Sequence, residues 1–310
     1  MRNDVIEVLF RAQRRRLWGL AYRITGTAQD ADDIVQETFV RLLERTSENH
    51  KELGPWLARV TTNLSIDALR RRRRRAYVGP WLPTPVEGAD QDALEGYVSD
   101  RPDPEARYSL LESSTYAFLL ALEALAPRQR AILLLRDVLG CSVRETAALV
   151  TATEANVRVL HLRARRALEG YDQSRCVPTR ELRERYRATL ESFLGSLLAQ
   201  DVRGVEKLLA ESVRTITDAG GEYTALATPL LGRARVARFY LAAALHRRTG
   251  DPRVVIRQVN ALPAAVITLA RPVRRQAPLT VLRCELDREG LIAVVHAVLA
   301  SRKLGAFRVA

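Results

Sequence analysis

The sequence predicts a multidomain protein in which two all-α helical domains are followed by an α+β domain. Up to about residue 200 the apolar residues recur every three or four positions, as in helices, and no strand pattern is present. An acidic segment rich in Pro and Gly, residues 79–106, interrupts the helical pattern. Short β-rich runs follow beyond residue 212. A length of 310 residues fits two or three domains.

The first helical domain is predicted over residues 1–78. Apolar spacing indicates a helix over 5–24, and Thr27 is placed to cap a second helix over 28–44. Pro55 suits the first turn of a third helix, which continues into six consecutive arginines at 70–75.

Residues 79–106 are predicted to form a linker. They carry one basic and seven acidic side chains, and their prolines remove backbone donors and disfavour helix at the preceding residues. The negative charge is compatible with docking on a basic neighbour and equally with a solvated segment.

The second helical domain is predicted over residues 107–172, with helices near 107–125, 127–139, 142–150 and 154–169. The last two have helix-turn-helix proportions, and Ser142 with Glu145 forms a capping box. The core stripe of the last helix leaves a face of arginines and short apolar residues exposed, namely Arg158, Val159, Leu162, Arg163 and Arg166. Such a face suits the major groove of DNA, although a basic surface helix in a bundle has the same pattern.

The α+β domain is predicted over residues 179–310. Its helices are expected near 179–199, 201–211 and 232–246. Its strands are expected over 213–217, 254–261, 265–270, 279–286 and 292–299. This part of the sequence holds 22 basic and 12 acidic residues.

The composition excludes several classes of protein. A net charge of +13 favours a polyanionic partner. Three widely spaced cysteines argue against a disulfide framework and a four-cysteine zinc site, and the four histidines form no ligand-spaced pair. We therefore expect no metal and no cofactor. The sequence begins without the apolar run of a signal peptide and holds no membrane-spanning stretch, so we expect a cytoplasmic protein.

The third helix is predicted to present a basic face. Helical phase places Arg59, Asn63 and Arg70 opposite its apolar stripe, with Trp56 beside them. Ile66 also falls on this side and is the one residue that does not fit a polar face. Two or three arginines at the helix end would satisfy its dipole, but six repel one another unless an anion is present. We therefore favour phosphate contact over a solvated helix end.

The second helix is predicted to present an acidic face, because Asp30, Asp33 and Glu37 lie opposite its apolar stripe. In a net basic domain such a stripe is compatible with solvent or with a basic protein surface.

Two blocks of sequence resemble the extracytoplasmic-function sigma factors, which direct bacterial RNA polymerase to promoters. Residues 30–38 (DADDIVQET) followed by 55–70 (PWLARVTTNLSIDALR) resemble their region 2, and residues 125–136 (LAPRQRAILLLR) with the helix-turn-helix resemble their region 4. The resemblance covers about residues 1–170, and both blocks occur in the family's order.

The resemblance implies three sets of contacts. Facing the β′ clamp of core RNA polymerase would be Asp30, Asp33, Gln36 and Glu37. Recognition and opening of the −10 element would use Trp56, Arg59, Asn63, Asp67, Arg70 and Arg71. Recognition of the −35 element would use Arg158, Val159, Leu162 and Arg163, with Arg166 on the same face. Val159 and Leu160 stand where the family commonly has a small polar residue and an arginine, so the promoter preference of relatives does not carry over to this protein.

The tail resembles the sigma subgroup with a fused, cone-shaped SnoaL-like domain. The similar segments are 77–85 (YVGPWLPTP), 218–223 (DAGGEY) and 259–264 (VNALPA), although Ala219 and Glu222 depart from the subgroup's glycine-rich loop. In the regulatory hypothesis the domain packs against the linker and region 2. The residues expected in this contact are Trp81, Pro83, Pro85, Asp218, Gly220, Gly221 and Tyr223.

Two other functions are compatible with the sequence. SnoaL-like domains include cyclases and isomerases, for which Asp218 and His296 would be the acid and base. The second alternative is a helix-turn-helix regulator that works without polymerase. The acidic face of the second helix argues against this alternative. We expect a sigma factor that is not itself an enzyme.

Overall fold

The computed structural model describes residues 2–44, 53–87, 107–305 and 307. The chain divides into two compact units. The helical unit comprises residues 1–75 and 88–177, and the sheet unit comprises residues 76–87 and 178–310. Residues 76–87, which the sequence divides between the first domain and the linker, thus group with the C-terminal domain. Residues 88–106 of the predicted linker lie outside the described residues.

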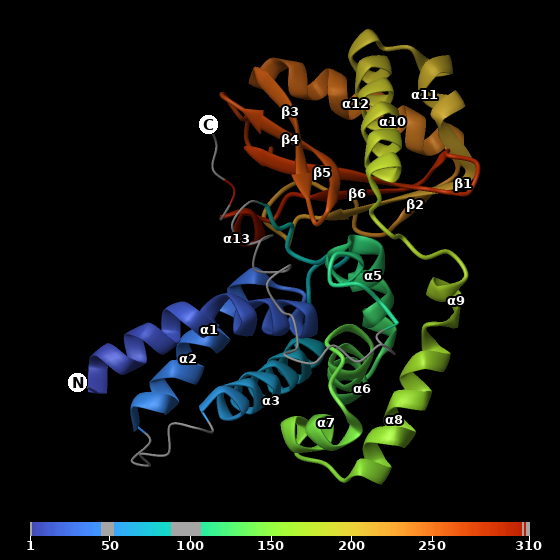
Figure 1. The fold of residues 1–310 in the computed structure, drawn as a ribbon. Helices are drawn as coiled ribbons and strands as arrows, with labels where there is room; N and C mark the ends of the chain where they lie inside the picture. Colours follow the sequence, from blue (N-terminus) through green and yellow to red (C-terminus); the bar gives the residue numbers. More distant parts are fainter. Residues whose placement is uncertain (1, 45–52, 88–106, 306, 308–310) are drawn as a thin grey trace. The chain divides into compact units, whose positions relative to one another are not determined.

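Three helices form the N-terminal part of the helical unit (Figure 1): α1 (Arg2–Thr25), α2 (Ala28–Glu44) and α3 (Leu53–Arg74). Gly26 adopts a φ of 78° between the first two, a conformation that glycine takes without strain. The Thr27 hydroxyl then accepts from the backbone N–H of Asp30 at 3.3 Å, which is the predicted cap. Buried Leu20, Ile34 and Leu57 give each helix a share of one core.

The second part of the helical unit contains the helix-turn-helix. Its elements are η2 (Glu112–Ser114), α5 (Tyr116–Ala121), η3 (Leu122–Ala124), α6 (Pro127–Leu133), the π-helical η4 (Leu134–Val138), α7 (Val143–Val150), α8 (Glu154–Ala167) and α9 (Glu169–Asp172). The single helix predicted over 107–125 is wrong. Thr115 is extended, with ψ at 151°, and its side chain caps a new helix by accepting from the N–H of Phe118.

Helix α3 is packed on more than one side, which explains the residue that did not fit its predicted basic face. That residue, Ile66, is 2% exposed. The helix contacts α1 and α2 and also α6 and α7. Small buried residues at Thr61, Thr62 and Ser65 leave room for this second layer. A helix with two covered faces has no single apolar stripe, so the one-sided pattern misplaces its exposed surface.

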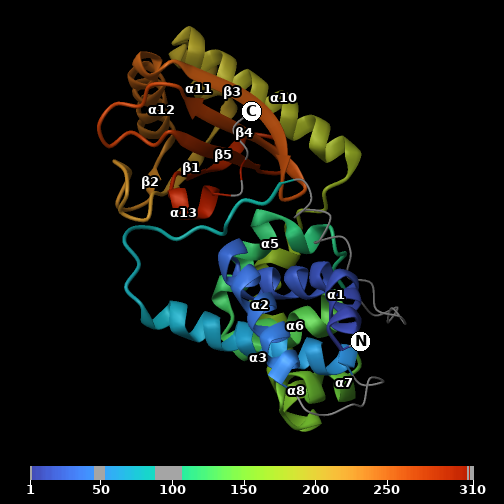
Figure 2. The same ribbon diagram turned by 90° about the vertical axis from the view of Figure 1, so that its left-hand side faces the viewer.

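The sheet unit is an α+β domain with a six-stranded sheet in the order β2-β1-β6-β5-β4-β3. Its strands are β1 (Leu209–Asp218), β2 (Leu230–Leu231), β3 (Pro252–Val259), β4 (Leu262–Leu269), β5 (Leu279–Leu286) and β6 (Ile292–Val298). Among the strand pairs of the described residues, β1 and β6 run parallel and the others antiparallel. The helices are α10 (Arg180–Ala199), α11 (Val202–Leu208), α12 (Arg233–Arg247), η5 (Arg248–Gly250) and α13 (Ser301–Leu304). Figures 1 and 2 both show α10, α11 and α12 on one side of the sheet.

The core of the sheet unit lies between these helices and the sheet. Phe193, Val236 and Val295 are fully buried in it. The hydroxyls of Thr215 and Tyr240 are 2.6 Å apart and satisfy each other inside it. The helix predicted over 201–211 ends at Leu208, because buried Leu209 and Ala210 already belong to the sheet. The two-residue strand β2 was not predicted. Among the described helices, none is long and apolar enough to cross a bilayer.

Candidate nucleic-acid interface and regulatory contact

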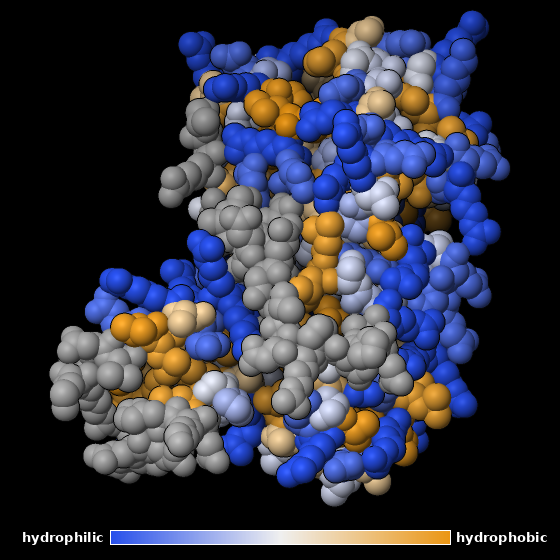
Figure 3. All heavy atoms as spheres, viewed as in Figure 1, coloured by the Kyte–Doolittle hydropathy of each residue, from blue (hydrophilic) through white to orange (hydrophobic). Residues whose placement is uncertain are grey.

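The outer face of α2 is acidic with an apolar border. Asp33, Gln36 and Glu37 are exposed and Asp30 is half-buried. On the same helix Val40 and Leu43 are 46% and 50% exposed. Figure 3 shows apolar side chains among polar ones over α1 and α2. This face combines negative charge with apolar area, a mixture that suits a basic protein surface better than solvent alone.

The predicted basic face of α3 is only partly open. Arg59, Asp67 and Arg71 are exposed, whereas Trp56, Asn63 and Arg70 are half-buried. The Asp67 carboxylate accepts from Arg70 at 2.8 Å. The Nδ2 of Asn63 donates to the carbonyl oxygens of Arg59 at 2.8 Å and Leu149 at 2.9 Å. The amide predicted to read a base is therefore held by the end of α7.

The arginine run at the end of α3 is also engaged. Arg72 donates to the Glu123 carboxylate at 2.5 Å and to the Thr25 carbonyl at 2.6 Å. Arg73 donates to the carbonyl oxygens of Glu123 at 2.9 Å and Leu125 at 2.6 Å. Arg72 and Arg73 thus have a structural role in this conformation, whereas Arg71, Arg74 and Arg75 are exposed.

Glu123 joins the two parts of the helical unit. Its carboxylate pairs with Arg72 and also with the fully buried Arg130. Burial alone would raise the pKa of Glu123, but the charges and hydrogen bonds of Arg130 and Arg72 outweigh it and lower the pKa. Burial also lowers the pKa of Arg130 to about 10, so the guanidinium stays charged at neutral pH.

Helix α8 presents an open face. The five residues predicted to reach DNA are all exposed, and Val159 and Leu162 are 49% and 52% exposed. The preceding helix, α7, starts with the expected capping box. The Ser142 hydroxyl accepts from the N–H of Glu145 at 3.1 Å, and the Glu145 carboxylate accepts from the N–H of Ser142 at 2.7 Å. Helix α8 thus has the exposure of a recognition helix.

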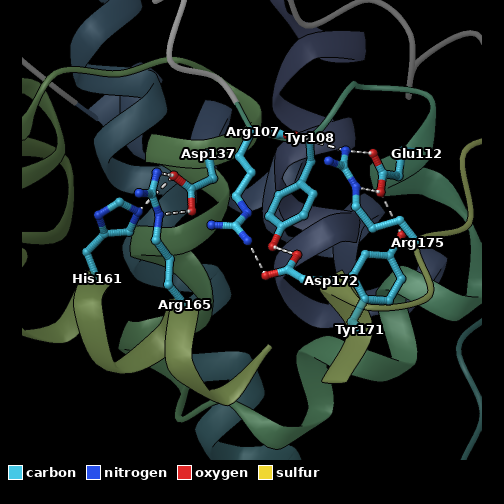
Figure 4. Close-up of polar contacts among 9 residues, drawn as sticks. All are labelled: Arg107, Tyr108, Glu112, Asp137, His161, Arg165, Tyr171, Asp172 and Arg175. Carbon is cyan, nitrogen blue, oxygen red and sulfur yellow. Dashed lines mark hydrogen bonds and ion pairs between the residues drawn. The ribbon is translucent and has the colours of Figure 1, made fainter. Parts of the chain in front are cut away.

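The inner face of α8 is fixed by one buried carboxylate (Figure 4). Asp137, 1% exposed, lies 2.8 Å from Nε2 of His161 and accepts from Arg165 at 2.6 and 3.0 Å. Burial would raise the pKa of Asp137, but the hydrogen bonds and charges of His161 and Arg165 lower it overall. His161 and Arg165 are four residues apart, so they share one helix face and set the rotation of α8.

Two further carboxylates close the helix-turn-helix at its other end (Figure 4). Glu112 accepts from Tyr171 at 2.9 Å and from Arg175 at 2.5 and 2.8 Å. Asp172 accepts from Tyr108 at 2.7 Å and from Arg107 at 2.5 Å. These contacts tie the segment after α8 to the start of the domain. No local sequence pattern signals them, because the partners are 59 to 65 residues apart.

In the sheet unit, residues 76–87 form a segment, here termed the strap, that is held by Asp218. The Asp218 carboxylate accepts from the Tyr77 hydroxyl at 2.6 Å and from the N–H of Leu82 at 2.8 Å. Lys303 of α13 lies 2.5 Å from the same carboxylate and also donates to the Leu82 carbonyl. The carboxylate is fully buried, and Lys303 balances its charge while the Tyr77 hydroxyl and the Leu82 N–H complete its hydrogen bonds.

Other expected residues of the regulatory contact lie along this strap. Trp81 is half-buried with Nζ of Lys303 4.6 Å from its ring centre, while Pro83 and Pro85 are buried. Sequence reasoning missed Lys303, which no motif singles out.

The loop after Asp218 approaches the strap closely. A Cβ on Gly220 would lie 3.3 Å from the Tyr77 hydroxyl, and one on Gly221 would lie 3.2 Å from Val78. Both glycines have positive φ, 57° and 81°. The departing residue Glu222 accepts from the N–H of Ser301 at 3.1 Å. Tyr223 does not reach the strap in any of these bonds, and its hydroxyl lies 2.6 Å from that of Ser301.

Asn260 holds the far end of the strap. Its side chain accepts from the N–H of Val86 at 3.0 Å, and its own N–H donates to the Val86 carbonyl at 3.0 Å. Asn260 has a φ of 49°, a conformation that asparagine tolerates better than most residues. This residue belongs to the 259–264 segment that carries the resemblance, but its role was not foreseen.

In the alternative catalytic pair, His296 is buried and Asp218 is hydrogen-bonded to the strap. His296 is buried, and burial lowers its pKa to about 3, assisted by the charges of Arg283 and Arg214. Its Nδ1 lies 3.5 Å from Glu285, while the carboxylate of Asp218 is bound by the strap. Within the described residues no group of His, Cys, Asp and Glu could hold a metal ion.

Comparison with known proteins matches both helical domains. Residues 9–75 match the family model of sigma-70 region 2, and residues 116–168 match that of sigma-70 region 4. The ECF RNA polymerase sigma factor SigJ of Mycobacterium tuberculosis is 31% identical over 234 residues, which cover 75% of this chain and 71% of SigJ. SigG of the same species is 39% identical over 168 residues, covering 50% of this chain and 45% of SigG.

The fold agrees with these relatives. The crystal structure of the M. tuberculosis extracytoplasmic function sigma factor SigJ superposes with a TM-score of 0.71 at 24% identity and covers 96% of this chain and 98% of that one. The chain belongs to the family of ECF RNA polymerase sigma factors. It directs transcription initiation at promoters, and the predicted fold class of two helical sigma domains followed by an α+β domain is confirmed.

Proposed function

We propose that this sigma factor binds the β′ clamp of core RNA polymerase through α2, reads the −10 element with α3 and the −35 element with α8, and is regulated by its sheet unit. The supporting observation for α8 is its exposed face of five candidate residues above the Asp137 anchor. Each domain alone offers few base contacts, worth about 1–3 kcal/mol each when bidentate. Tethering two such domains raises the effective concentration of the second contact.

The acidic face of α2 is the proposed polymerase contact. Asp33→Arg places a cation at an exposed position that faces the basic partner, so binding of core polymerase should weaken by more than about 100-fold (about 2.7 kcal/mol). Glu181→Arg on α10 is the control for the same change of charge, and circular dichroism should show both variants folded. Binding of Asp33→Arg at wild-type strength would contradict the proposed surface.

The strap is the proposed regulatory element, and the observation that carries this is the Asp218 carboxylate with its three donors. The domain then acts by holding residues 76–87 and not by catalysis, because a carboxylate committed to Tyr77, Leu82 and Lys303 is not placed to take a substrate proton. A cytoplasmic location follows from the proposed partners, polymerase and promoter DNA.

Release of the strap tests this proposal. Asp218→Asn should change run-off transcription by the reconstituted holoenzyme about threefold or more, since the bond to Lys303 loses its charge. Asp287→Asn is the control at a half-buried turn in the same unit, away from the strap. Truncation after Cys176 should change output in the same direction as Asp218→Asn. Equal output from all variants would remove the regulatory role.

A further inference from the structure

Helix α12 and the loop between β4 and β5 form a cationic surface that the functions above do not use. Arg235, Arg238 and His246 are exposed on α12 and lie within about 80° of one another by helical phase. The 15-residue helix contains no acidic residue. Beyond its end follow exposed Arg248, and in the loop Arg271, Arg274 and Arg275. These seven residues are termed the α12 surface.

Backbone contacts bring the two segments of this surface together. The N–H of Arg271 donates to the Gly250 carbonyl at 3.0 Å, and the side chain of Gln276 donates to the His246 carbonyl at 3.4 Å. The loop is further fixed by the N–H of Thr224, which donates to the Arg275 carbonyl at 3.0 Å. The loop arginines therefore continue the helix's cationic stripe on an ordered framework.

Several arginines of the same unit lie beside a carboxylate, whereas three on this surface do not. Arg180, Arg187 and Arg233 each lie within 4 Å of a glutamate carboxylate. Arg235, Arg274 and Arg275 form no such ion pair with a described carboxylate. Asp251 is the one exposed acid in the turn between α12 and β3. Unpaired like charges repel one another, and an ordinary solvated face relieves this with interleaved acids, as α10 does.

We propose that the α12 surface binds the phosphate backbone of duplex DNA when the holoenzyme is on a promoter. A helix of 15 residues is about 22 Å long, enough to follow several phosphates of one strand. Arginine suits this partner, because its planar guanidinium donates two parallel hydrogen bonds to phosphate oxygens. The contact carries no base information, so it adds affinity at any sequence.

The test compares two double variants of the full-length protein in reconstituted holoenzyme. Arg274→Gln/Arg275→Gln removes two charges from the α12 surface, and Arg180→Gln/Arg187→Gln removes two from α10. Promoter affinity is measured against salt concentration. The first variant should reduce the slope of log affinity against log salt by about 1 to 2, because each phosphate contact contributes about 0.9. The second should leave the slope at the wild-type value, and the loss should be equal on promoters of different sequence.

Three results would overturn the proposal. The two variants could change the slope equally, which would assign the effect to net charge. The loop variant could leave the slope unchanged. It could also weaken binding to core polymerase while sparing the DNA slope, which would make the partner an acidic protein surface. If wild-type holoenzyme bound no promoter, the proposed function itself would fail, and that outcome is distinct from the other three.

Discussion

Helices α3 and α8 are both basic, but the molecule holds them in opposite ways. The candidate reading face of α8 is exposed, and its anchoring residues His161 and Arg165 point to a carboxylate beneath it. In α3 the candidate residue Asn63 is bound to the Leu149 carbonyl, and Arg72 of the arginine run is bound to Glu123. Charge alone therefore marks both helices as candidates for DNA binding, whereas the residues packed against each helix decide which of its side chains are open to a partner.

This contrast leads to an order of events under the proposed function. Helix α8 is ready to meet the −35 element as it stands. Helix α3 must exchange its contacts with the second part of the helical unit for contacts with the −10 element. Binding of polymerase is then expected to favour the released state, because a ligand shifts an equilibrium by its differential affinity for the two states.

Removing the anchor of α8 should have the largest effect on the contrast. Asp137→Asn leaves Arg165 beside a neutral amide, so unfolding free energy should fall by about 2–3 kcal/mol and −35 discrimination should be lost. Chemical denaturation and promoter competition measure the two effects. Asp172→Asn is the control: it removes contacts to Arg107 and Tyr108 at the other end of the module, and should cost stability while sparing discrimination. Loss of discrimination in both variants would reduce Asp137 to a merely structural residue.

The buried carboxylates of Asp137 and Glu123 make the stability of the helical unit sensitive to acid. The folded-state pKa values of Asp137 and Glu123 are lowered, so the stability they contribute is present above their unfolded pKa values of about 4 and is lost as pH falls below them. The denaturation midpoint should therefore fall less steeply below pH 4 in Asp137→Asn than in the wild type. Parallel curves for the two proteins would argue against the assigned pairs.

Shortening one reading residue of α8 should have an intermediate effect. Arg163→Ala removes an exposed guanidinium, and selectivity for the −35 element should fall by about 1–2 kcal/mol with the fold unchanged. Competition between promoters that differ only in the −35 element measures the loss. Glu169→Ala, an exposed residue just beyond α8, is the control. A uniform loss across all sequences would make Arg163 a phosphate contact.

Freeing α3 should have the smallest effect. Glu123→Gln removes the charge that holds Arg72, so the free protein should bind a single-stranded −10 oligonucleotide about threefold more tightly. Fluorescence anisotropy at low salt measures this change, with Glu44→Gln as an exposed control. Unchanged or weaker binding by Glu123→Gln would show that the contacts of α3 do not restrain it.

Local sequence patterns predicted the elements but not the ties between them. The bounds of α2 and β5 and the Ser142 capping box follow from periodicity and capping rules, which act within a few residues. Local patterns could not place the strap, because Leu82 and Asp218 are 136 residues apart, and it was the family resemblance that put both segments in one contact. Lys303 and Asp137 were missed for the same reason: a buried ion pair leaves no periodic signal. Helical phase could not account for buried Ile66, because it assumes one covered face and α3 also packs against a second layer of helices.

The decisive measurement is selection of promoters from a library by the reconstituted full-length holoenzyme. Reading by two modules predicts two separate blocks of preferred sequence, about two helical turns apart, with a weaker upstream preference in Arg163→Ala and an unchanged downstream block. Selection of a single block, or selection that is unchanged when core polymerase is omitted, would contradict it and leave a DNA-binding protein that does not work as two modules.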